Sequence, residues 1–228
     1  MATQETENSK TRQLQITADG SHTLYIPEIE EHYHSINGAV QESRHVFINA
    51  GWKQISKEEI RILEIGFGTG LNAFLTLLET LDTTKKVTYS LIELYPLERN
   101  LIEALNYPEI ICPDKQALFY ALHDAPWNCL TPITSTFTVD KIKGNSNTCE
   151  LPKAIDLVYF DAFAPDKQPE MWNQEIFNKL YAHSNPKGIL TTYCAKGSVR
   201  RMMQSAGYAV ERIPGPPGKR EMLRASKK

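Results

Sequence analysis

Short apolar runs alternate with amphipathic segments from residue 60 to the end of the chain. The runs have the length and the β-branched content of buried strands, whereas the segments between them space their apolar residues as helices do. Because a strand–helix–strand unit returns the chain in the same direction, this alternation predicts an α/β fold with a mostly parallel sheet covered on both faces. The predicted strands are 60–65, 87–92, 136–142, 155–160, 188–193, 208–213 and 221–225, and the predicted helices are 71–81, 97–106, 114–123, 171–183 and 197–206.

The N-terminal part of the chain departs from this alternation. Two apolar runs flank Asp19-Gly20 and predict a small β-hairpin, and an apolar stripe predicts a helix at 38–50. We expect these elements to form an extension, 14–58, of the α/β domain rather than a second domain.

The strand at 60–65 runs into a glycine-rich turn that is followed by a helix. The turn, 64–70, has the sequence EIGFGTG, in which glycines let the backbone approach a ligand and the helix start presents free N–H groups. A dinucleotide site needs its third glycine at residue 71, which is a leucine. An acidic residue followed by G-x-G-x-G instead predicts S-adenosylmethionine as the cofactor. A parallel sheet that ends in an antiparallel hairpin, as the Pro-Gly-rich turn at 214–218 predicts, is the organisation of Rossmann-like class I methyltransferases.

Two further polar residues follow the next predicted strands. Glu93 ends the second strand, where a carboxylate can accept hydrogen bonds from both ribose hydroxyls. Asn145, after the strand at 136–142, is the candidate for the adenine site, because its amide oxygen can accept from an amino group. The predicted cofactor-binding residues are Glu64, Gly66, Phe67, Gly68, Thr69, Gly70, Asn72, Glu93 and Asn145.

Asp161 is the candidate catalytic residue, because it follows an apolar strand, 155–160, at its carboxyl end. Ligands of open α/β sheets bind beyond this end of the strands. A primary amine, with a reference pKa of about 10.4 for lysine, is protonated near neutral pH and has no lone pair for attack. A carboxylate beside the sulfonium can accept that proton and orient the nitrogen. Its alternative role is to cap a helix or pair with a lysine.

Charge is distributed unevenly along the chain. From residue 196 to the end there are nine Lys or Arg and two Glu, a net charge of +7, so the total of −2 leaves −9 for the rest. This asymmetry is typical either of a polyanion-binding edge or of a solvated basic face.

The remaining composition indicates an ordinary globular protein. A length of 228 residues suits one domain, 14–228, after a polar N-terminal segment, 1–13, that we expect to be disordered. No signal peptide, membrane-length apolar run or CxxC spacing is present, which favours a reducing cytoplasm and no membrane partner. We expect no metal site, and His32 and His34 are interpreted as surface polar residues.

Several stretches resemble one family of tRNA-modifying methyltransferases. The stretches are FDAFAPDKQPEMW at 160–172, GSVRR at 197–201, KREML at 219–223, YHS at 33–35 and ESRHVF at 42–47. Together with the cofactor loop they are similar to the enzymes that form 5-methylaminomethyl-2-thiouridine, which occur alone (MnmD) or as the N-terminal half of MnmC. The resemblance covers about residues 14–225.

This resemblance implies methyl transfer from S-adenosylmethionine to the exocyclic amine of 5-aminomethyl-2-thiouridine at the tRNA wobble position, with Asp161 as the catalytic carboxylate. The basic C-terminal segment would then contact anticodon-stem phosphates, and the single-stranded loop would offer its base to the pocket. Phe163 and Trp172 are candidates for stacking on that base, although such aromatics more often pack in a core. The substrate-binding residues implied are Glu42, Phe163, Lys196, Arg200, Arg201, Lys219 and Arg220.

The sequence departs from the two-domain enzymes in two places. It stops where a flavin-dependent oxidase would continue, so we expect no such activity here, and a separate enzyme would supply the amine. Residues 144–155 form only a short connection where the two-domain enzyme has a longer helical segment.

Two other functions fit parts of the pattern. The cofactor loop alone also allows a transferase acting on a small-molecule amine. The fold alone allows a noncatalytic RNA-binding domain, because fold does not determine function.

Overall fold

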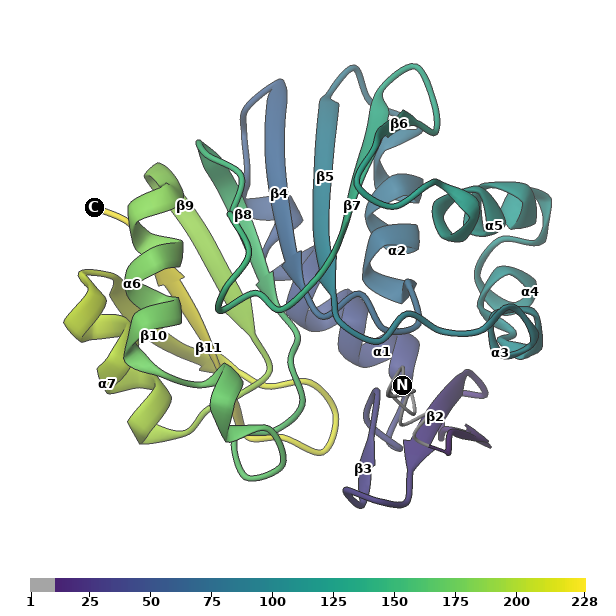
Figure 1. Cartoon of the computed structure of the whole chain (residues 1–228), viewed down its shortest axis with the longest axis horizontal. Coiled ribbons are helices and arrows are strands. Elements are labelled where there is room, and N and C mark those ends of the chain that lie inside the picture. The colour runs from purple at the N-terminus through teal and green to yellow at the C-terminus, as the bar shows by residue number, and fades with distance from the viewer. Residues whose placement is uncertain (1–10) are drawn as a thin grey trace, which may run out of the picture.

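The computed structural model describes residues 11–228, which form a central eight-stranded sheet, helices on its two faces and a small N-terminal sheet (Figure 1). The strand order of the large sheet is β10-β11-β9-β8-β4-β5-β7-β6. Its strands are β4 (Glu59–Ile65), β5 (Lys86–Glu93), β6 (Leu130–Pro132), β7 (Phe137–Lys143), β8 (Ile155–Phe160), β9 (Ser184–Thr192), β10 (Ala209–Pro214) and β11 (Glu221–Ser226).

The five central strands, from β9 to β7, run parallel, whereas β6, β10 and β11 pair antiparallel with their neighbours. The predicted fold class, including the C-terminal antiparallel hairpin, is thus confirmed. Strand β8 is buried at every position, as expected for a strand covered on both faces.

Helices cover the two faces of the sheet with separate apolar clusters. Phe74 and Phe119 belong to the cluster on one face, and Phe177 and Met203 belong to the cluster on the other. The helices are α1 (Ala39–Ser43), α2 (Leu71–Thr80), α3 (Arg99–Ala104), α4 (Tyr107–Ile111), α5 (Gln116–Asp124), α6 (Gln174–His183) and α7 (Gly197–Ala206). Among the described residues, no helix is both long and apolar enough to cross a membrane.

The predicted N-terminal hairpin is present as β1 (Gln13–Ile16) and β2 (His22–Ile26). A short third strand, β3 (Glu31–His32), was not predicted because two residues leave no periodic signal. The predicted helix at 38–50 is α1 followed by a wider π-helical turn, Arg44–Asn49. The expected disorder at 1–13 falls largely outside the described residues.

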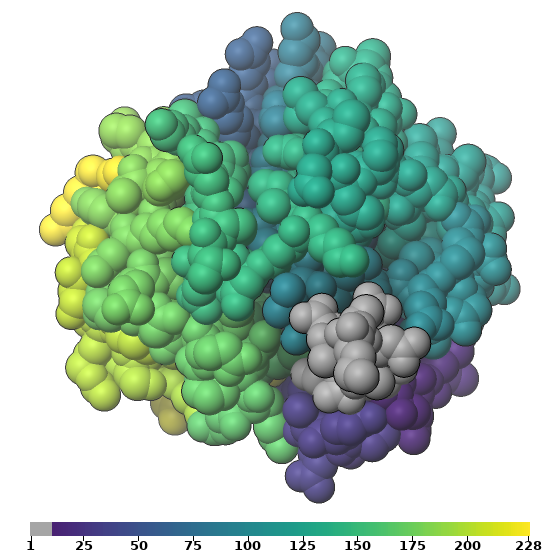
Figure 2. Space-filling model, in the orientation of Figure 1, coloured from purple at the N-terminus to yellow at the C-terminus, as the bar shows by residue number. Residues whose placement is uncertain are grey.

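The N-terminal sheet lies at the end of the large sheet where the parallel strands finish (Figures 1 and 2). Side-chain hydrogen bonds hold it there. The Asn106 amide accepts from the His22 N–H at 2.8 Å and donates to the Gly20 carbonyl at 2.9 Å. The N-terminal sheet therefore faces the carboxyl ends of the central strands.

Candidate active site

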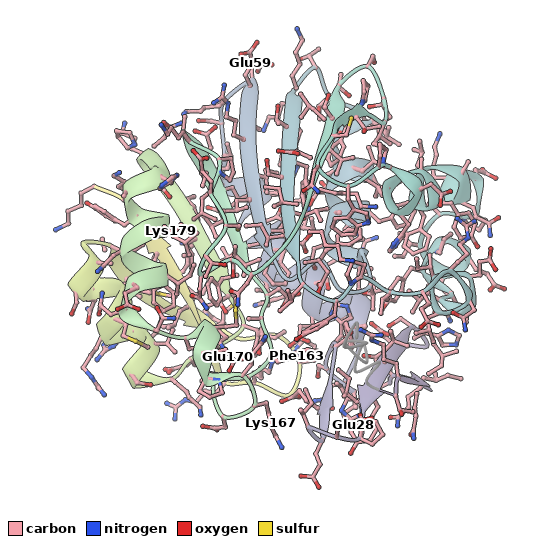
Figure 3. All side chains as sticks on the ribbon, viewed as in Figure 1. Glu28, Glu59, Phe163, Lys167, Glu170 and Lys179 are labelled. Atoms are coloured by element: carbon pink, nitrogen blue, oxygen red, sulfur yellow. The ribbon has the colours of Figure 1, made fainter. Side chains whose placement is uncertain are left out.

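A cavity of about 470 Å³ lies at the carboxyl ends of β4, β5 and β8. The loops after these strands and the N-terminal sheet line it, and its size suits a small-molecule ligand. In Figure 3, Phe163 and Lys167 lie at this end of the sheet, and Glu59, at the start of β4, lies at the opposite end.

The glycine-rich loop after β4 forms part of the cavity wall. Gly66 has a φ of 87°, and a Cβ there would lie 2.6 Å from the Asp161 carbonyl oxygen. Gly68 has a φ of 50°, and a Cβ there would lie 2.9 Å from the Tyr33 ring. Glycine is therefore required at both positions, because other parts of the protein occupy the space of a side chain, and both glycines line the cavity.

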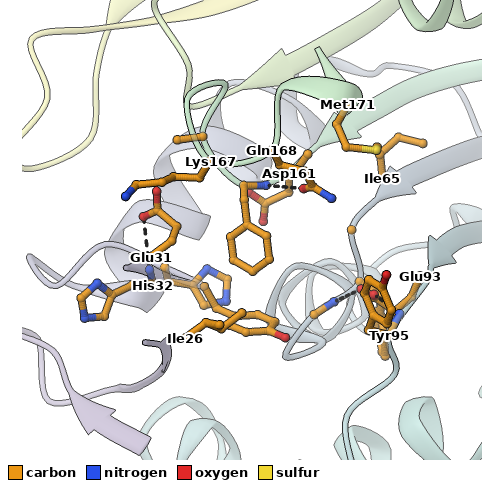
Figure 4. Close-up of a pocket in the computed structure, with 18 of the residues that line it drawn as sticks. Ile26, Glu31, His32, Ile65, Glu93, Tyr95, Asp161, Lys167, Gln168 and Met171 are labelled. Atoms are coloured by element: carbon orange, nitrogen blue, oxygen red, sulfur yellow. Dashed lines mark hydrogen bonds between the residues drawn. The ribbon is translucent and has the colours of Figure 1, made fainter. Parts of the chain in front are cut away.

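Glu93 lies at the end of β5 and lines the same cavity (Figure 4). One carboxylate oxygen accepts from the Gly68 N–H at 3.0 Å, and the other accepts from the Tyr95 N–H at 2.8 Å. These two bonds fix the carboxylate beside the loop, and each oxygen keeps a lone pair for another donor. Asn145 also lines the cavity, and its amide oxygen accepts from the Asn147 N–H at 2.9 Å.

Asp161 follows β8 and lines the cavity together with these residues (Figure 4). Its Oδ2 accepts from the Asn72 side-chain amide at 2.8 Å. Burial raises the pKa of the Asp161 carboxyl to about 7, although the Asn72 hydrogen bond opposes this rise. The nearby Glu42 charge raises the pKa further, and the Lys219 charge lowers it. Asp161 thus has the pKa of a group that exchanges a proton near neutral pH.

Glu42 and Lys219 form an ion pair at the cavity wall, with 2.6 Å between Nζ and Oε1. The second Glu42 oxygen accepts from the Ser35 N–H at 2.7 Å, and the Lys219 ammonium lies 4.0 Å from the centre of the Tyr193 ring. The pair joins α1 to the turn between β10 and β11, two parts of the chain far apart in sequence.

The two candidate aromatic residues have different surroundings. Phe163 lines the cavity and meets the Tyr33 ring edge to face, with centroids 5.1 Å apart. Trp172 is 6% exposed, packs on Phe160, and donates from Nε1 to the Phe163 carbonyl at 2.7 Å. Core packing is therefore the role of Trp172, whereas Phe163 remains available to a ligand.

Three predicted cofactor-binding residues lie behind the loop and are not among the described residues that line the cavity. Glu64 is fully buried, and its carboxylate accepts from the Asn72 amide at 2.9 Å and from the Tyr89 hydroxyl at 3.0 Å. Asn72 is buried in the first turn of α2. Gly70 precedes α2 in a left-handed conformation, and a Cβ there would lie 2.6 Å from the His123 Nε2. Phe67 and Thr69, by contrast, line the cavity.

The interpretation of His34 as a surface residue is wrong. Its side chain is buried and lines the cavity, and Nε2 lies 2.7 Å from the Thr69 Oγ1. Burial lowers the pKa of His34 to about 4, so the ring is neutral near pH 7. His32 is partly buried. Within residues 11–228, no group of three or more His, Cys, Asp or Glu is arranged to hold a metal ion.

Of the basic C-terminal residues with predicted roles, only Lys219 is among the described residues that line the cavity. Lys196 pairs with Asp166 at the surface, and Arg201 and Arg220 are exposed. Arg200 is partly buried, and its Nε has no hydrogen-bond partner among residues 11–228.

Several cavity residues from the region of the N-terminal sheet were not assigned to the site by the sequence analysis, among them Arg12 and Tyr33, which flank its strands. Arg12 donates from Nε to the Tyr33 hydroxyl at 3.0 Å and from Nη2 to the Tyr95 carbonyl at 3.1 Å. It thereby connects the N-terminal sheet to the loop after β5. The Arg12–Tyr95 contact joins residues 83 positions apart in sequence, which no local pattern reveals.

Comparison with known proteins supports this picture. The model of an S-adenosyl-L-methionine-dependent methyltransferase family matches residues 134–228. The chain is 30% identical over 215 residues, 89% of its length, to the tRNA 5-methylaminomethyl-2-thiouridine biosynthesis bifunctional protein MnmC of Magnetococcus marinus. It is 32% identical over 232 residues to the protein of the same name from Pseudomonas savastanoi pv. phaseolicola, covering 95% of this chain. The chain spans 32% and 35% of these two relatives, about a third of their length.

The crystal structure of MNMC2 from Aquifex aeolicus is also similar, with a TM-score of 0.81 and 26% identity over 97% of this chain and 72% of that one. Spermidine synthase from Thermotoga maritima, with a TM-score of 0.52 and 11% identity, shares the fold alone. The family model and these similarities support S-adenosyl-L-methionine as the cofactor, and the chain is a relative of the MnmC proteins.

Proposed function

We propose that this chain methylates the exocyclic amine of 5-aminomethyl-2-thiouridine at the wobble position of tRNA. The observation that carries the proposal is the position of Asp161, a carboxyl group with a raised pKa in the cavity that also contains the glycine loop and Glu93. The names of the MnmC relatives specify the corresponding modified nucleoside. A separate enzyme would supply the aminomethyl precursor.

The chemistry assigned to Asp161 is removal of a proton from the amine. When bound, the cofactor supplies an electrophilic methyl group on a sulfonium. An ammonium has no lone pair to attack it, so the Asp161 carboxylate accepts one proton and holds the freed nitrogen in line. With a pKa of about 7, Asp161 is ionised above neutral pH, and activity is expected to fall as the pH decreases through this value.

The cofactor is assigned to the wall formed by the loop and Glu93. The backbone at Gly66 and Gly68 would lie against its methionine and ribose parts, because both glycines line the cavity beside Glu93. The fixed Glu93 carboxylate would accept from the ribose hydroxyls, and Asn145 would meet the adenine. Phe67 and Thr69 would line this site, whereas Glu64, Gly70 and Asn72 would support it from behind.

The macromolecular substrate is assigned to the anticodon stem-loop. An unpaired loop base can be turned into a pocket at modest cost, and Phe163 offers an aromatic surface for it. Glu42 and Lys219 lie beside Asp161 and would contact the same nucleotide. Phosphates would be held by the basic residues outside the cavity, so tRNA affinity should fall steeply with salt. These residues are Lys196, Arg200, Arg201 and Arg220.

The test is to incubate the protein with methyl-labelled S-adenosylmethionine and with tRNA that lacks only the final methyl group. Digestion and chromatography should place the label in 5-methylaminomethyl-2-thiouridine. The matched control is the same tRNA with uridine at the wobble position, which has no acceptor amine. Label in neither tRNA, or in both equally, would refute the proposal.

A further inference from the structure

The amide of Asn72 connects two carboxylates that lie at the ends of neighbouring strands. Its Nδ2 donates to Glu64 Oε1 at 2.9 Å and to Asp161 Oδ2 at 2.8 Å. Glu64 belongs to β4 and Asp161 follows β8, and the two strands are paired in parallel. Asn72 itself is 2% exposed in the first turn of α2. One buried amide group therefore sits between the carboxylate before the glycine loop and the carboxylate assigned to catalysis.

This arrangement fixes the orientation of the amide. A rotation by 180° would remove both N–H donors from Glu64 and Asp161 and place the amide oxygen against their carboxyl oxygens. In the observed orientation the Asn72 Oδ1 is buried without a hydrogen-bond partner among residues 11–228. A buried unpaired acceptor costs about 1–3 kcal/mol. The amide thus uses both N–H groups on carboxylates even though its oxygen is left unpaired.

Glu64 is also held by a hydrogen bond to its second carboxyl oxygen. The Tyr89 hydroxyl donates to the other Glu64 oxygen at 3.0 Å, and both side chains are fully buried. Glu64 is thereby held by donors from α2 and β5, and it lies outside the cavity lined by the described residues.

We propose that Asn72 is a positioning residue that holds the Asp161 carboxylate toward the methyl-transfer site, with Glu64 and Tyr89 anchoring Asn72 in turn. The acidic residue before the glycine loop then acts on Asp161 through Asn72 and not on the cofactor. The inference deepens the proposed function, because it gives Asp161 a role in the reaction.

A neutral donor suits this task better than a cation. A lysine or arginine at this position would pair with Asp161 and keep its proton affinity low. The amide instead fixes Oδ2 and leaves Oδ1, which accepts no hydrogen bond from residues 11–228, free to receive a proton. Loss of the amide removes a bond that favours the charged form, so the carboxyl should become a weaker acid.

The test measures Asp161 directly, by carbon-13 NMR titration of its side-chain carboxyl in the protein without substrate, with Asp161→Asn used for assignment. In Asn72→Ala the titration midpoint should rise by about one pH unit or more, because a charged hydrogen bond is lost. The affinity for S-adenosylmethionine, measured by calorimetry, should change by less than about threefold. Asn185→Ala is the matched control, because the Asn185 amide donates to the carboxylate of Asp156 at 2.8 Å, and it should leave the Asp161 midpoint unchanged.

An unchanged Asp161 midpoint in Asn72→Ala, or a cofactor affinity that falls tenfold or more, would overturn the proposal. Asn72→Ser, which keeps one hydroxyl donor, serves if the alanine variant does not fold, and a smaller upward shift is expected. Because this titration needs no tRNA, its result is independent of whether tRNA is the substrate. Once an acceptor is known, the double variant with Asp161→Asn should be no slower than Asp161→Asn alone, since Asn72 acts through Asp161.

Discussion

The two ends of strand β8 each hold an aspartate in a different environment. Asp156, near the start of the strand, is 4% exposed and accepts from the Arg61 N–H at 3.0 Å and the Asn185 amide at 2.8 Å. It also pairs with the Lys57 ammonium. Asp161, directly after the strand, has one side-chain donor, Asn72, and no ion pair within residues 11–228.

The contrast shows how one strand can carry both a structural and a reactive carboxylate. At Asp156, a cation and two N–H donors satisfy the charge, so the group connects β8 to β4 and β9. At Asp161, burial with a single neutral donor leaves the charge poorly compensated, and its pKa rises to about 7. A carboxyl group with a perturbed pKa in a cavity is typical of functional sites. Asp156, on the same strand, is the structural carboxylate with which Asp161 is compared.

The largest expected effect comes from exchanging the Asp161 carboxylate for an amide. Asp161→Asn cannot accept a proton, so we expect methyl transfer to the amine to slow by about 10²–10⁴-fold. Cofactor affinity should stay within about threefold, because Asp161 is not assigned to cofactor binding. Transfer rates with labelled cofactor and calorimetry provide the two measurements.

Asp156→Asn is the matched control for this experiment. It lies on the same strand but outside the cavity, so its turnover should remain within about twofold of the wild-type rate once folded protein is quantified. Equal losses in the two variants would show that Asp161 acts through the fold and not through the reaction.

The sequence predicted the elements that have a strong hydrophobic pattern or clear turn residues at their ends. The strand at 155–160 and the helix at 197–206 have the predicted bounds. Signals were weaker where tertiary pairing decides the structure. Strand β9 begins at Ser184, four residues before the predicted 188, because pairing with β8 extends it. The helix expected at 171–183 begins only at Gln174, where Asn173 caps it and accepts from the Ile176 N–H.

The candidate site was predictable in part for the same reason. Asp161 and Glu93 directly follow or end strands, and topology alone brings such residues to one edge of a parallel sheet. The burial of Glu64 behind the loop was not predictable, because it depends on Asn72 and Tyr89 from other elements. His34 was misjudged because its ring is covered only when the N-terminal sheet docks on Thr69.

A second test addresses stability at the structural end of β8. Asp156→Ala removes the acceptor of the Arg61 N–H and the Asn185 amide and leaves Lys57 without its partner. We expect a loss of about 3 kcal/mol in the free energy of unfolding, with a melting temperature lower by roughly 6–12 °C. Thermal unfolding followed by circular dichroism checks this, and a loss below about 1 kcal/mol would contradict the structural role.

A third test probes the cavity end through its loop. Gly68→Ala places a Cβ 2.9 Å from the Tyr33 ring at a φ of 50°, so the loop must shift, and we expect cofactor affinity to fall about tenfold. Gly20→Ala is the control, because Gly20 also has a positive φ, 81°, but no atom lies within 4 Å of the added Cβ. That variant should lose stability without loss of cofactor affinity. Calorimetry distinguishes the two, and equal affinities would remove the loop from the cofactor site.

The smallest expected effect is a gain in stability at the reactive end. Because folding raises the pKa of Asp161 from 3.8 to about 7, its contribution to stability is complete below pH 3.8 and is lost as the pH rises through 7. At pH 8 the wild-type protein therefore holds a poorly compensated buried charge, which Asp161→Asn removes while the Asn72 amide keeps an acceptor. The variant should melt a few degrees higher than wild type at pH 8, and the difference should be smaller at pH 5, where the folded carboxyl is protonated but the unfolded one is still ionised, and should vanish only below pH 3.8. Melting curves at both values measure this, and a variant that is less stable at pH 8 would mean that the Asp161 charge is satisfied in the folded protein, as that of Asp156 is.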